Sequence, residues 1–126
     1  MLNDAAIPAL THVTDATFEQ DVLQSQGPVV VDFWAPWCAP CRFLGAALEE
    51  VAPEFAGQVR IAKLNVDENP QTSGAFGVQS IPTMIFFKDG QPIGATQGAL
   101  PADALRDLLR RHADGTLASR SPATDV

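Results

Sequence analysis

Residues 29–41 read Val-Val-Val-Asp-Phe-Trp-Ala-Pro-Trp-Cys-Ala-Pro-Cys, and they decide the fold. The first six are β-branched or aromatic apart from one acid, and are apolar on both faces. This pattern predicts a strand that is covered on both sides of a sheet. Apolar residues then recur at helical spacing from Phe43 to Phe55, and Gly57 ends that helix. The sequence therefore places Cys38 and Cys41 between a buried strand and an amphipathic helix.

Strands and helices alternate on both sides of this segment. Further strands are predicted at Thr11–Thr14, Val59–Val66, Thr83–Phe87 and Gln91–Gln97, and further helices at Phe18–Leu23, Gln71–Phe76 and Pro101–Leu109, with Thr14 and Asp15 as candidate caps of the first. The alternation requires parallel strands joined by right-handed crossovers. Asp89-Gly90 predicts a closing antiparallel hairpin whose last strand, containing Pro92, lies at an edge. We expect an α/β protein with a mixed five-stranded sheet flanked by helices on both faces.

The length of 126 residues corresponds to one domain, and a hydrophobic fraction of 46% can form a core. Residues 1–9 are predicted to be a flexible N-terminus and residues 10–112 the folded domain. Residues 113–126 are rich in Ala, Ser, Thr, Gly, Pro and Asp and contain one leucine, which predicts a disordered tail.

The net charge of -7 would repel a phosphate backbone, so nucleic acid is not an expected partner. No apolar stretch approaches the roughly 20 residues that span a bilayer, and the N-terminus lacks the basic start of a secretory signal. We therefore expect a cytoplasmic protein. In that reducing compartment a close cysteine pair is more often catalytic or metal-binding than structural.

The position of the cysteine pair predicts thiol chemistry. Cys38 is expected at the N-terminal end of the helix, where free amides and the helix dipole favour the thiolate. Cys38 would attack a disulfide, and Cys41, one turn further in, would then resolve the mixed disulfide. Two alternatives are a zinc half-site, for which only His12, His112 and carboxylates remain without finger-like spacing, and a structural disulfide, whose short loop constrains the unfolded chain weakly.

The segment from Val31 to Arg42 resembles the active-site segment of thioredoxins. The likeness continues in order through Lys63-Leu-Asn-Val-Asp67, Gly77-Val-Gln-Ser-Ile-Pro-Thr83 and Phe87-Lys-Asp-Gly90, and it covers about residues 10–112. The resemblance implies a thioredoxin fold and a protein-disulfide reductase that acts through a redox-active Cys38–Cys41 disulfide. It also implies recharging by an NADPH-dependent thioredoxin reductase, disulfide-containing client proteins, no bound cofactor or metal, and a monomer.

Asp32 is an acid within an apolar strand. If it is buried, its pKa rises towards neutrality and it can accept a proton; the alternative is an acid at the strand end that points to water. The resemblance favours burial, because Asp32 matches the family's buried aspartate, which assists deprotonation of the second thiol. Lys63 matches the lysine that pairs with this aspartate, and its alternative is a snorkelling surface lysine.

The remaining site residues would form a groove for substrate. By resemblance, Ile81-Pro82 contains a cis-proline opposite the cysteines, which leaves neighbouring backbone free to pair with an extended substrate. Trp37 would lie partly exposed beside the dithiol. The other expected binding residues are Ala39 and Pro40 between the cysteines, and Gly98, which allows close backbone approach. The alternatives are a trans strand-start proline, a core tryptophan and a simple turn glycine.

Several residues depart from the family pattern. Ala39 replaces the usual glycine, which would shift the redox potential. Ala46, after Gly45, replaces a proline that kinks the helix, so a straighter or differently bent helix is expected. Pro36-Trp37 and Arg42 are more similar to the second bacterial thioredoxin, although the cysteines of its N-terminal zinc module are missing here. Another function, a thioredoxin-fold holdase with a secondary redox role, stays open. His12 and His112 are expected to be surface or satisfied edge residues without a role.

Overall fold

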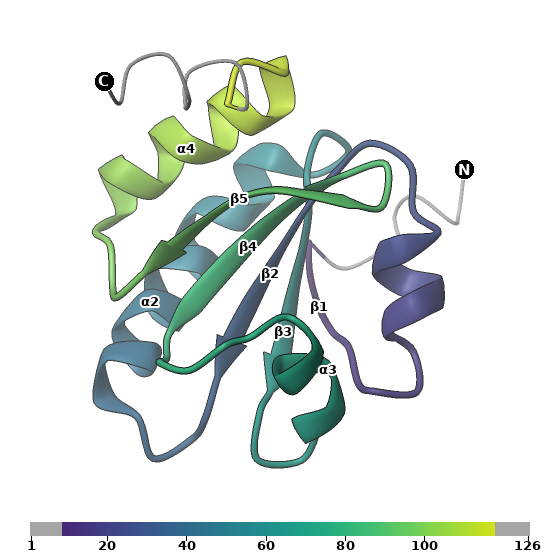
Figure 1. Ribbon diagram of the computed structural model, residues 1–126. Helices are drawn as coiled ribbons and strands as arrows, with labels where there is room; N and C mark the ends of the chain where they lie inside the picture. The colour runs from purple at the N-terminus through teal and green to yellow at the C-terminus, as the bar shows by residue number, and fades with distance from the viewer. Residues whose placement is uncertain (1–8, 118–126) are drawn as a thin grey trace, which may run out of the picture.

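The five strands form one mixed sheet in the order β1-β3-β2-β4-β5 (Figure 1). Their bounds are Leu10–His12 for β1, Pro28–Trp34 for β2, Arg60–Asn65 for β3, Thr83–Lys88 for β4 and Gln91–Gln97 for β5. Strands β1, β3 and β2 run parallel, whereas β4 is antiparallel to β2 and β5 is antiparallel to β4. This computed structural model describes residues 9–117, and it confirms the predicted sheet with the apolar strand β2 at its centre.

Helices cover both faces of the sheet, as predicted (Figure 1). Helices α2 (Ala39–Val51) and α4 (Ala102–Asp114) share one face, where Leu44, Leu48 and Leu105 pack with Val30 of β2. The opposite face is covered by the single turn η1 (Glu19–Leu23) and by α3 (Pro70–Ala75). There Val22 of η1 and Phe76, which follows α3, pack with Val31. Because side chains alternate along a strand, Asp32 faces the same side as Val30, towards α2.

Two predicted helix ends differ in the structure. The helix expected to continue to Phe55 ends as an α-helix at Val51, and Ala52–Phe55 form the tighter turn η2. The reason is Pro53, which lacks an N–H and whose ring does not fit the interior of an α-helix. Helix α4 continues to Asp114, two residues into the predicted tail, and Gly115 caps it with a left-handed φ of 80°. Residues 118–126 of that tail and residues 1–8 lie outside the described residues.

Asp15 caps a different helix from the one predicted. Its carboxylate accepts hydrogen bonds from the backbone N–H groups of Gln71 (3.2 Å) and Thr72 (2.8 Å), and from the Thr72 hydroxyl (2.6 Å), at the start of α3. The backbone N–H of Asp15 donates to Asn69 Oδ1 (2.8 Å). The loop after β1 is therefore fastened to α3, and only Thr14 serves the first turn, where its hydroxyl accepts the Thr17 N–H.

The predicted hairpin joins β4 to β5. Asp89 and Gly90 have φ values of 50° and 82°, the left-handed conformations that a two-residue turn of this kind needs. A side chain at Gly90 would also run into the carbonyl oxygen of Leu23, so the turn packs closely against η1. Pro92 lies on the edge strand β5, as expected from its missing donor. Within residues 9–117, no helix has the length and apolar character needed to cross a bilayer.

Candidate active site

The two cysteines lie at the carboxyl end of β2, where helix α2 begins. Cys38 is the residue that precedes the first turn of α2, and its sulfur accepts a hydrogen bond from the backbone N–H of Cys41 (3.2 Å). The two residues are joined by a disulfide, with Cα atoms 5.2 Å apart. Pro40 occupies the first helical turn, where a missing N–H costs nothing. A sulfur in this position faces the free amides of a helix N-terminus, which favour negative charge.

The cysteine pair is largely covered by the surrounding side chains. Cys38 is 5% exposed and Cys41 is 1% exposed. Ala35 is buried with them, and Trp34, Val66 and Ile81 pack around this small cluster. Cys38 is nevertheless the more exposed of the two residues, in the order that the predicted roles require.

The Ile81–Pro82 bond is cis and lies beside the cysteines. The carbonyl oxygen of Ile81 is 3.9 Å from Cys38 Sγ. The carbonyl of Pro82 accepts a hydrogen bond from the N–H of Gly98 (2.8 Å), whose φ of 91° is left-handed. Three residues that sequence analysis assigned to a groove, from two separate segments, are thus brought together next to Cys38.

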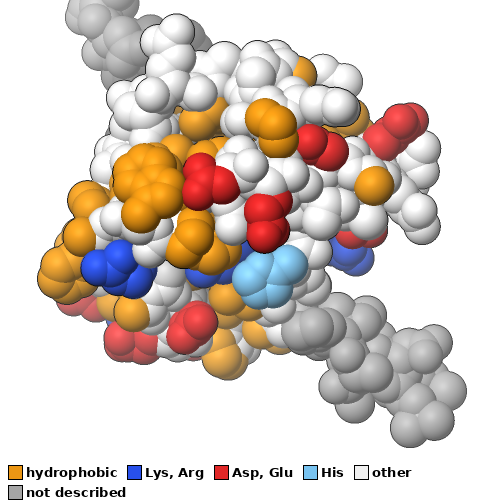
Figure 2. Space-filling view, turned by 90° about the horizontal axis from the view of Figure 1, so that it is seen from below, with side chains coloured by type: hydrophobic (Ala, Val, Ile, Leu, Met, Phe, Trp, Pro, Cys, Tyr) orange, Lys and Arg blue, Asp and Glu red, His pale blue; other side chains and the backbone are white. Residues whose placement is uncertain are grey.

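Trp37 is 68% exposed beside the disulfide, so the core alternative is wrong. Its indole Nε1 donates a hydrogen bond to Asp67 Oδ2 (2.9 Å), and Arg42 donates from Nη1 to the carbonyl of Pro36 (3.0 Å). Asp67 was not among the residues predicted for the site. Its position just after β3 could have indicated a role, because functional groups gather at the carboxyl ends of parallel strands. This end of the molecule shows hydrophobic side chains next to acidic ones (Figure 2).

Asp32 is completely buried in the middle of β2, so the alternative of an acid pointing to water is wrong. Neither carboxylate oxygen has a hydrogen-bond partner within residues 9–117. Burial raises the pKa of Asp32 to about 7, because the charged form loses its hydration, and the positive charge of Lys63 opposes the rise only in part. The loss of hydration outweighs the attraction of Lys63.

Lys63 is the partner of Asp32 in the register of β3 and β2, but it does not form the direct pair that the resemblance implies. Among the described residues, no ion pair or hydrogen bond joins the two side chains. The ammonium Nζ instead lies 4.3 Å from the centre of the Trp34 ring, in a cation–π contact. Lys63 therefore acts on Asp32 through space, from a position beside Trp34.

The two histidines differ. His12 is exposed, as expected. His112 is buried and only 2% exposed, and its Nε2 lies 3.1 Å from the carbonyl oxygen of Val29, so a surface position is wrong for this residue. Over residues 9–117, no three His, Cys, Asp or Glu side chains come together in a group that could hold a metal ion.

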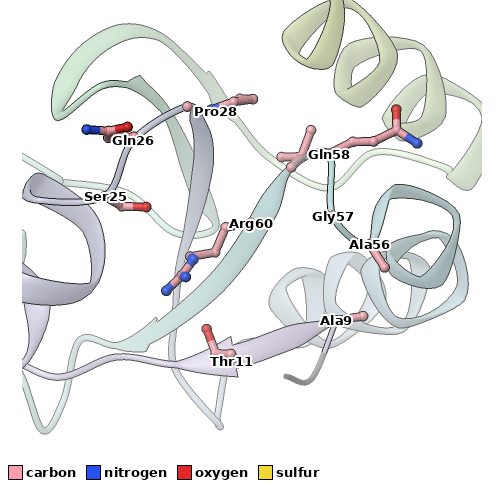
Figure 3. A pocket seen from close by; sticks show the side chains of 11 residues that line it. Ala9, Thr11, Ser25, Gln26, Pro28, Ala56, Gly57, Gln58 and Arg60 are labelled. Carbon is pink, nitrogen blue, oxygen red and sulfur yellow. The ribbon is translucent and has the colours of Figure 1, made fainter. Parts of the chain in front are cut away.

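A separate hollow of about 720 Å³ lies at the opposite end of the sheet, near the amino ends of β2 and β3 (Figure 3). Its lining includes Thr11, Ser25, Gln26, Gly57 and Arg60. It contains no thiol, and it is remote from the cysteines because these lie at the carboxyl end of β2. The redox chemistry therefore belongs to the cysteine end alone.

Comparisons with known proteins agree with this geometry. The family model described as thioredoxin matches residues 9–111. Thioredoxin 1 of Synechococcus elongatus is 49% identical over 100 residues, which are 79% of this chain and 94% of that protein. Thioredoxin of Haemophilus influenzae is 48% identical over 101 residues (80% and 94%), and thioredoxin of Rhodospirillum rubrum is 52% identical over 96 residues (76% and 92%). The chain belongs to the thioredoxin family of thiol–disulfide oxidoreductases, and its redox group is the Cys38–Cys41 disulfide itself.

Proposed function

We propose that this protein reduces protein disulfides through a dithiol–disulfide exchange in which Cys38 is the nucleophile. The Cys38 thiolate attacks one sulfur of the client disulfide and releases the other as a thiol after protonation. The Cys41 thiol then loses its proton, attacks Cys38 and releases the second client thiol. The client gains two electrons and two protons, and the protein is left with the Cys38–Cys41 disulfide.

One observation carries this assignment of roles, namely the hydrogen bond from the Cys41 N–H to the Cys38 sulfur at the start of α2 (3.2 Å). A backbone donor and the helix dipole both stabilise negative charge on that sulfur, which lowers the thiol pKa. Cys41 has no such position and is the more deeply buried of the two. Cys38 therefore meets the client first, and Cys41 resolves the mixed disulfide.

Client proteins would bind along the backbone at Ile81. Among residues 9–117, no backbone hydrogen bond reaches Ile81, so its N–H and C=O can pair with an extended client segment. Gly98 holds Pro82 from the other side, and the exposed ring of Trp37 offers an apolar surface. Ala39 and Pro40 complete the groove, since they separate the two cysteines at the start of α2.

Asp32 is proposed as the proton acceptor for Cys41. A carboxylate with a pKa of about 7 is shared between its two protonation states near neutral pH, so it can take up and return a proton during turnover. It faces α2 from β2, on the side where Cys41 is buried. Lys63 supplies the positive charge that keeps part of the Asp32 population ionised.

Membership of the family supports a proposal for the physiological setting. The relatives named above are thioredoxins of bacteria, and we propose that this chain works as a cytoplasmic monomer that an NADPH-dependent thioredoxin reductase recharges. Pro36-Trp37 and Arg42 support a closer relation to the second bacterial thioredoxin. In this chain, Ala39 replaces the usual glycine, and we propose that this replacement alters the redox potential.

Reduction of insulin disulfides by NADPH and a bacterial thioredoxin reductase tests the catalytic role. We expect Cys38→Ser to abolish turnover, because a hydroxyl at this position is not ionised at neutral pH. Ser25→Ala, in the hollow at the opposite end, is the matched control and should keep wild-type turnover. Normal turnover by Cys38→Ser would overturn the mechanism.

The resolving role of Cys41 predicts a trap. In Cys41→Ser the Cys38 thiolate still attacks, but no second thiol releases the client, so mixed disulfides should accumulate and disappear on addition of dithiothreitol. Non-reducing gels followed by mass spectrometry identify them. If Cys41→Ser captures no protein through a disulfide but still suppresses aggregation of unfolded proteins, the holdase is the better description.

A further inference from the structure

Gly45 is an unexpected residue at its position in α2. It is buried in the middle of the helix, where glycine destabilises the helix relative to alanine. Its backbone does not need glycine, since its φ is not among the left-handed values that the chain contains. The neighbouring buried positions of α2, Leu44 and Leu48, have large side chains. The reason for a glycine must therefore lie in the space beside it.

That space is occupied by the ammonium group of Lys63. A Cβ atom at Gly45 would lie 3.2 Å from Lys63 Nζ, closer than side-chain contacts ordinarily come. On another side, the ammonium contacts the Trp34 ring at 4.3 Å from its centre. Lys63 thus extends from β3 to the gap between the backbone of α2 and an indole ring, and a side chain at residue 45 would narrow this gap and displace the ammonium.

The position of Lys63 matters because little else acts on Asp32. From β3, the facing group is Lys63, and from β4 it is Met84, which has no charge. From α2, it is the cysteine pair, which does not titrate while oxidised. Arg42, also on α2, is exposed and donates to the Pro36 carbonyl instead. Lys63 is the source of the charge that acts on Asp32.

We propose that Gly45 is a positioning residue, whose missing side chain keeps the Lys63 ammonium beside Trp34 and so sets the strength of its action on the Asp32 carboxylate. The relevance of this arrangement for turnover rests on the function proposed above, but the arrangement itself does not. It couples the sequence of α2 to the proton acceptor of the site without any contact between Gly45 and Asp32.

The substitution Gly45→Ala has a predicted direction. The new methyl group and the Trp34 ring close two sides of the ammonium, and since Lys63 is half-buried, the open direction is towards solvent. As the positive charge withdraws and becomes hydrated, it stabilises the ionised carboxylate less. The pKa of Asp32 should rise, and the protein should hold this proton to higher pH.

The measurement is a carboxyl carbon-13 titration of Asp32 by NMR in the fully oxidised protein, where the cysteines do not titrate. We expect a higher pKa for Asp32 in Gly45→Ala than in the wild type. Gly74→Ala is the matched control, because Gly74 is also a helix glycine but its Cβ position meets nothing within 4 Å, and it should leave the pKa unchanged. An unchanged or lowered pKa in Gly45→Ala would overturn the proposal.

A double variant tests whether Lys63 transmits the effect. Lys63→Ala alone should raise the pKa of Asp32 further than Gly45→Ala does, and adding Gly45→Ala to it should then change nothing. A shift that persists without Lys63 contradicts the proposal. If Gly45→Ala fails to fold, the double variant should fold, because the side chain that occupies the gap is gone; failure of both is a second contradicting result.

These titrations need no turnover. Loss of insulin reduction in the wild type would overturn the proposed function and leave the positioning role intact. Normal insulin reduction by the wild type together with an unshifted pKa of Asp32 in Gly45→Ala would overturn the positioning role and leave the proposed function intact.

Discussion

At the scale of single residues, Asp32 combines a cost in stability with a use in chemistry. Its carboxylate lies in the centre of the sheet without a hydrogen bond from the described residues, and burial raises its pKa from 3.8 to about 7. The folded protein therefore holds this proton more tightly than the unfolded chain. The resulting contribution to folding is neutral below about pH 4, becomes unfavourable as the pH rises to 7, and stays so above it.

The variant Asp32→Asn should remove this pH dependence. A pKa difference of about three units corresponds to a destabilisation on the order of 4 kcal/mol above pH 7. We expect the oxidised variant to gain stability relative to the wild type at pH 8, and to gain much less at pH 4. Denaturant unfolding at both pH values measures this. Glu49 is an exposed acid on α2, and as a control Glu49→Gln should change the stability by the same amount at pH 4 and at pH 8. An equal effect of Asp32→Asn on stability at the two pH values would contradict the interpretation.

At the scale of elements, α3 depends on a residue far away in sequence. Its first amides are bound by Asp15 from the loop after β1, and Asn69 completes the contact by accepting the Asp15 N–H. Burial raises the pKa of Asp15, but the hydrogen bonds from Thr72 and Gln71 outweigh it and hold the pKa below its ordinary value. This stabilisation is present above the unfolded pKa of 3.8 and is lost as the pH falls through the lower folded value.

We expect Asp15→Ala to lower the denaturant midpoint at pH 7, because the buried Thr72 hydroxyl and the first amides of α3 lose their acceptor. The difference from the wild type should shrink as the pH falls below the unfolded pKa of 3.8 and through the lower folded pKa. The control is Glu68→Ala, an exposed acid near α3 that should leave the midpoint unchanged. Midpoints that coincide for Asp15→Ala and wild type at pH 7 would show that the cap is dispensable.

The elements themselves could largely be predicted from local patterns. The apolar run of β2, the turn residues Asp89 and Gly90, and Pro92 each contain their own physical reason, and all three predictions are confirmed. The errors arose where the reason is distant or was overlooked. Pro53 divides the long helix, and Asp15 finds its amides in α3 rather than in the next turn of the chain.

At the scale of the whole molecule, His112 connects the C-terminal helix to the central strand. Its ring lies between Phe86, at 5.3 Å between ring centres, and the carbonyl of Val29, which its Nε2 contacts. Burial lowers the pKa of His112 below 6.5, and the hydrogen bond to Val29 opposes this shift. Folding therefore favours the neutral ring, and this contribution, present above pH 6.5, is lost as the pH falls towards the lower folded pKa.

We predict that His112→Gln improves resistance to acid, since glutamine retains an N–H donor for Val29 but cannot become charged. Relative to the wild type, its stability should be better at pH 4.5 than at pH 7 in denaturant unfolding. The exposed His12 provides the matched control, and His12→Gln should show no such difference. If the stability of His112→Gln depends on pH in the same way as that of the wild type, the buried ring does not titrate in this range.

The residues of the functional site could be predicted from local motifs, but the contacts between them could not. Cys38, Cys41 and Pro82 were identified because each lies within a motif, and Asp32 because an acid in an apolar strand is anomalous. Contacts between side chains from different elements gave no such signal. The ammonium of Lys63 contacts the Trp34 ring instead of Asp32, and Asp67 accepts a hydrogen bond from the Trp37 indole. Both contacts depend on how the elements pack together, which local sequence patterns do not describe.

The outer strand β5 has a consequence for how copies of the protein meet. An open strand edge can recruit another strand and extend a sheet from molecule to molecule. In β5, Pro92 offers no donor, and the register with β4 slips there, since Phe87 pairs with Pro92 but Phe86 pairs with Gly94. An incoming strand would find neither a continuous ladder nor a regular pleat. The irregular rim thus makes β5 a poor template for an incoming strand of another copy.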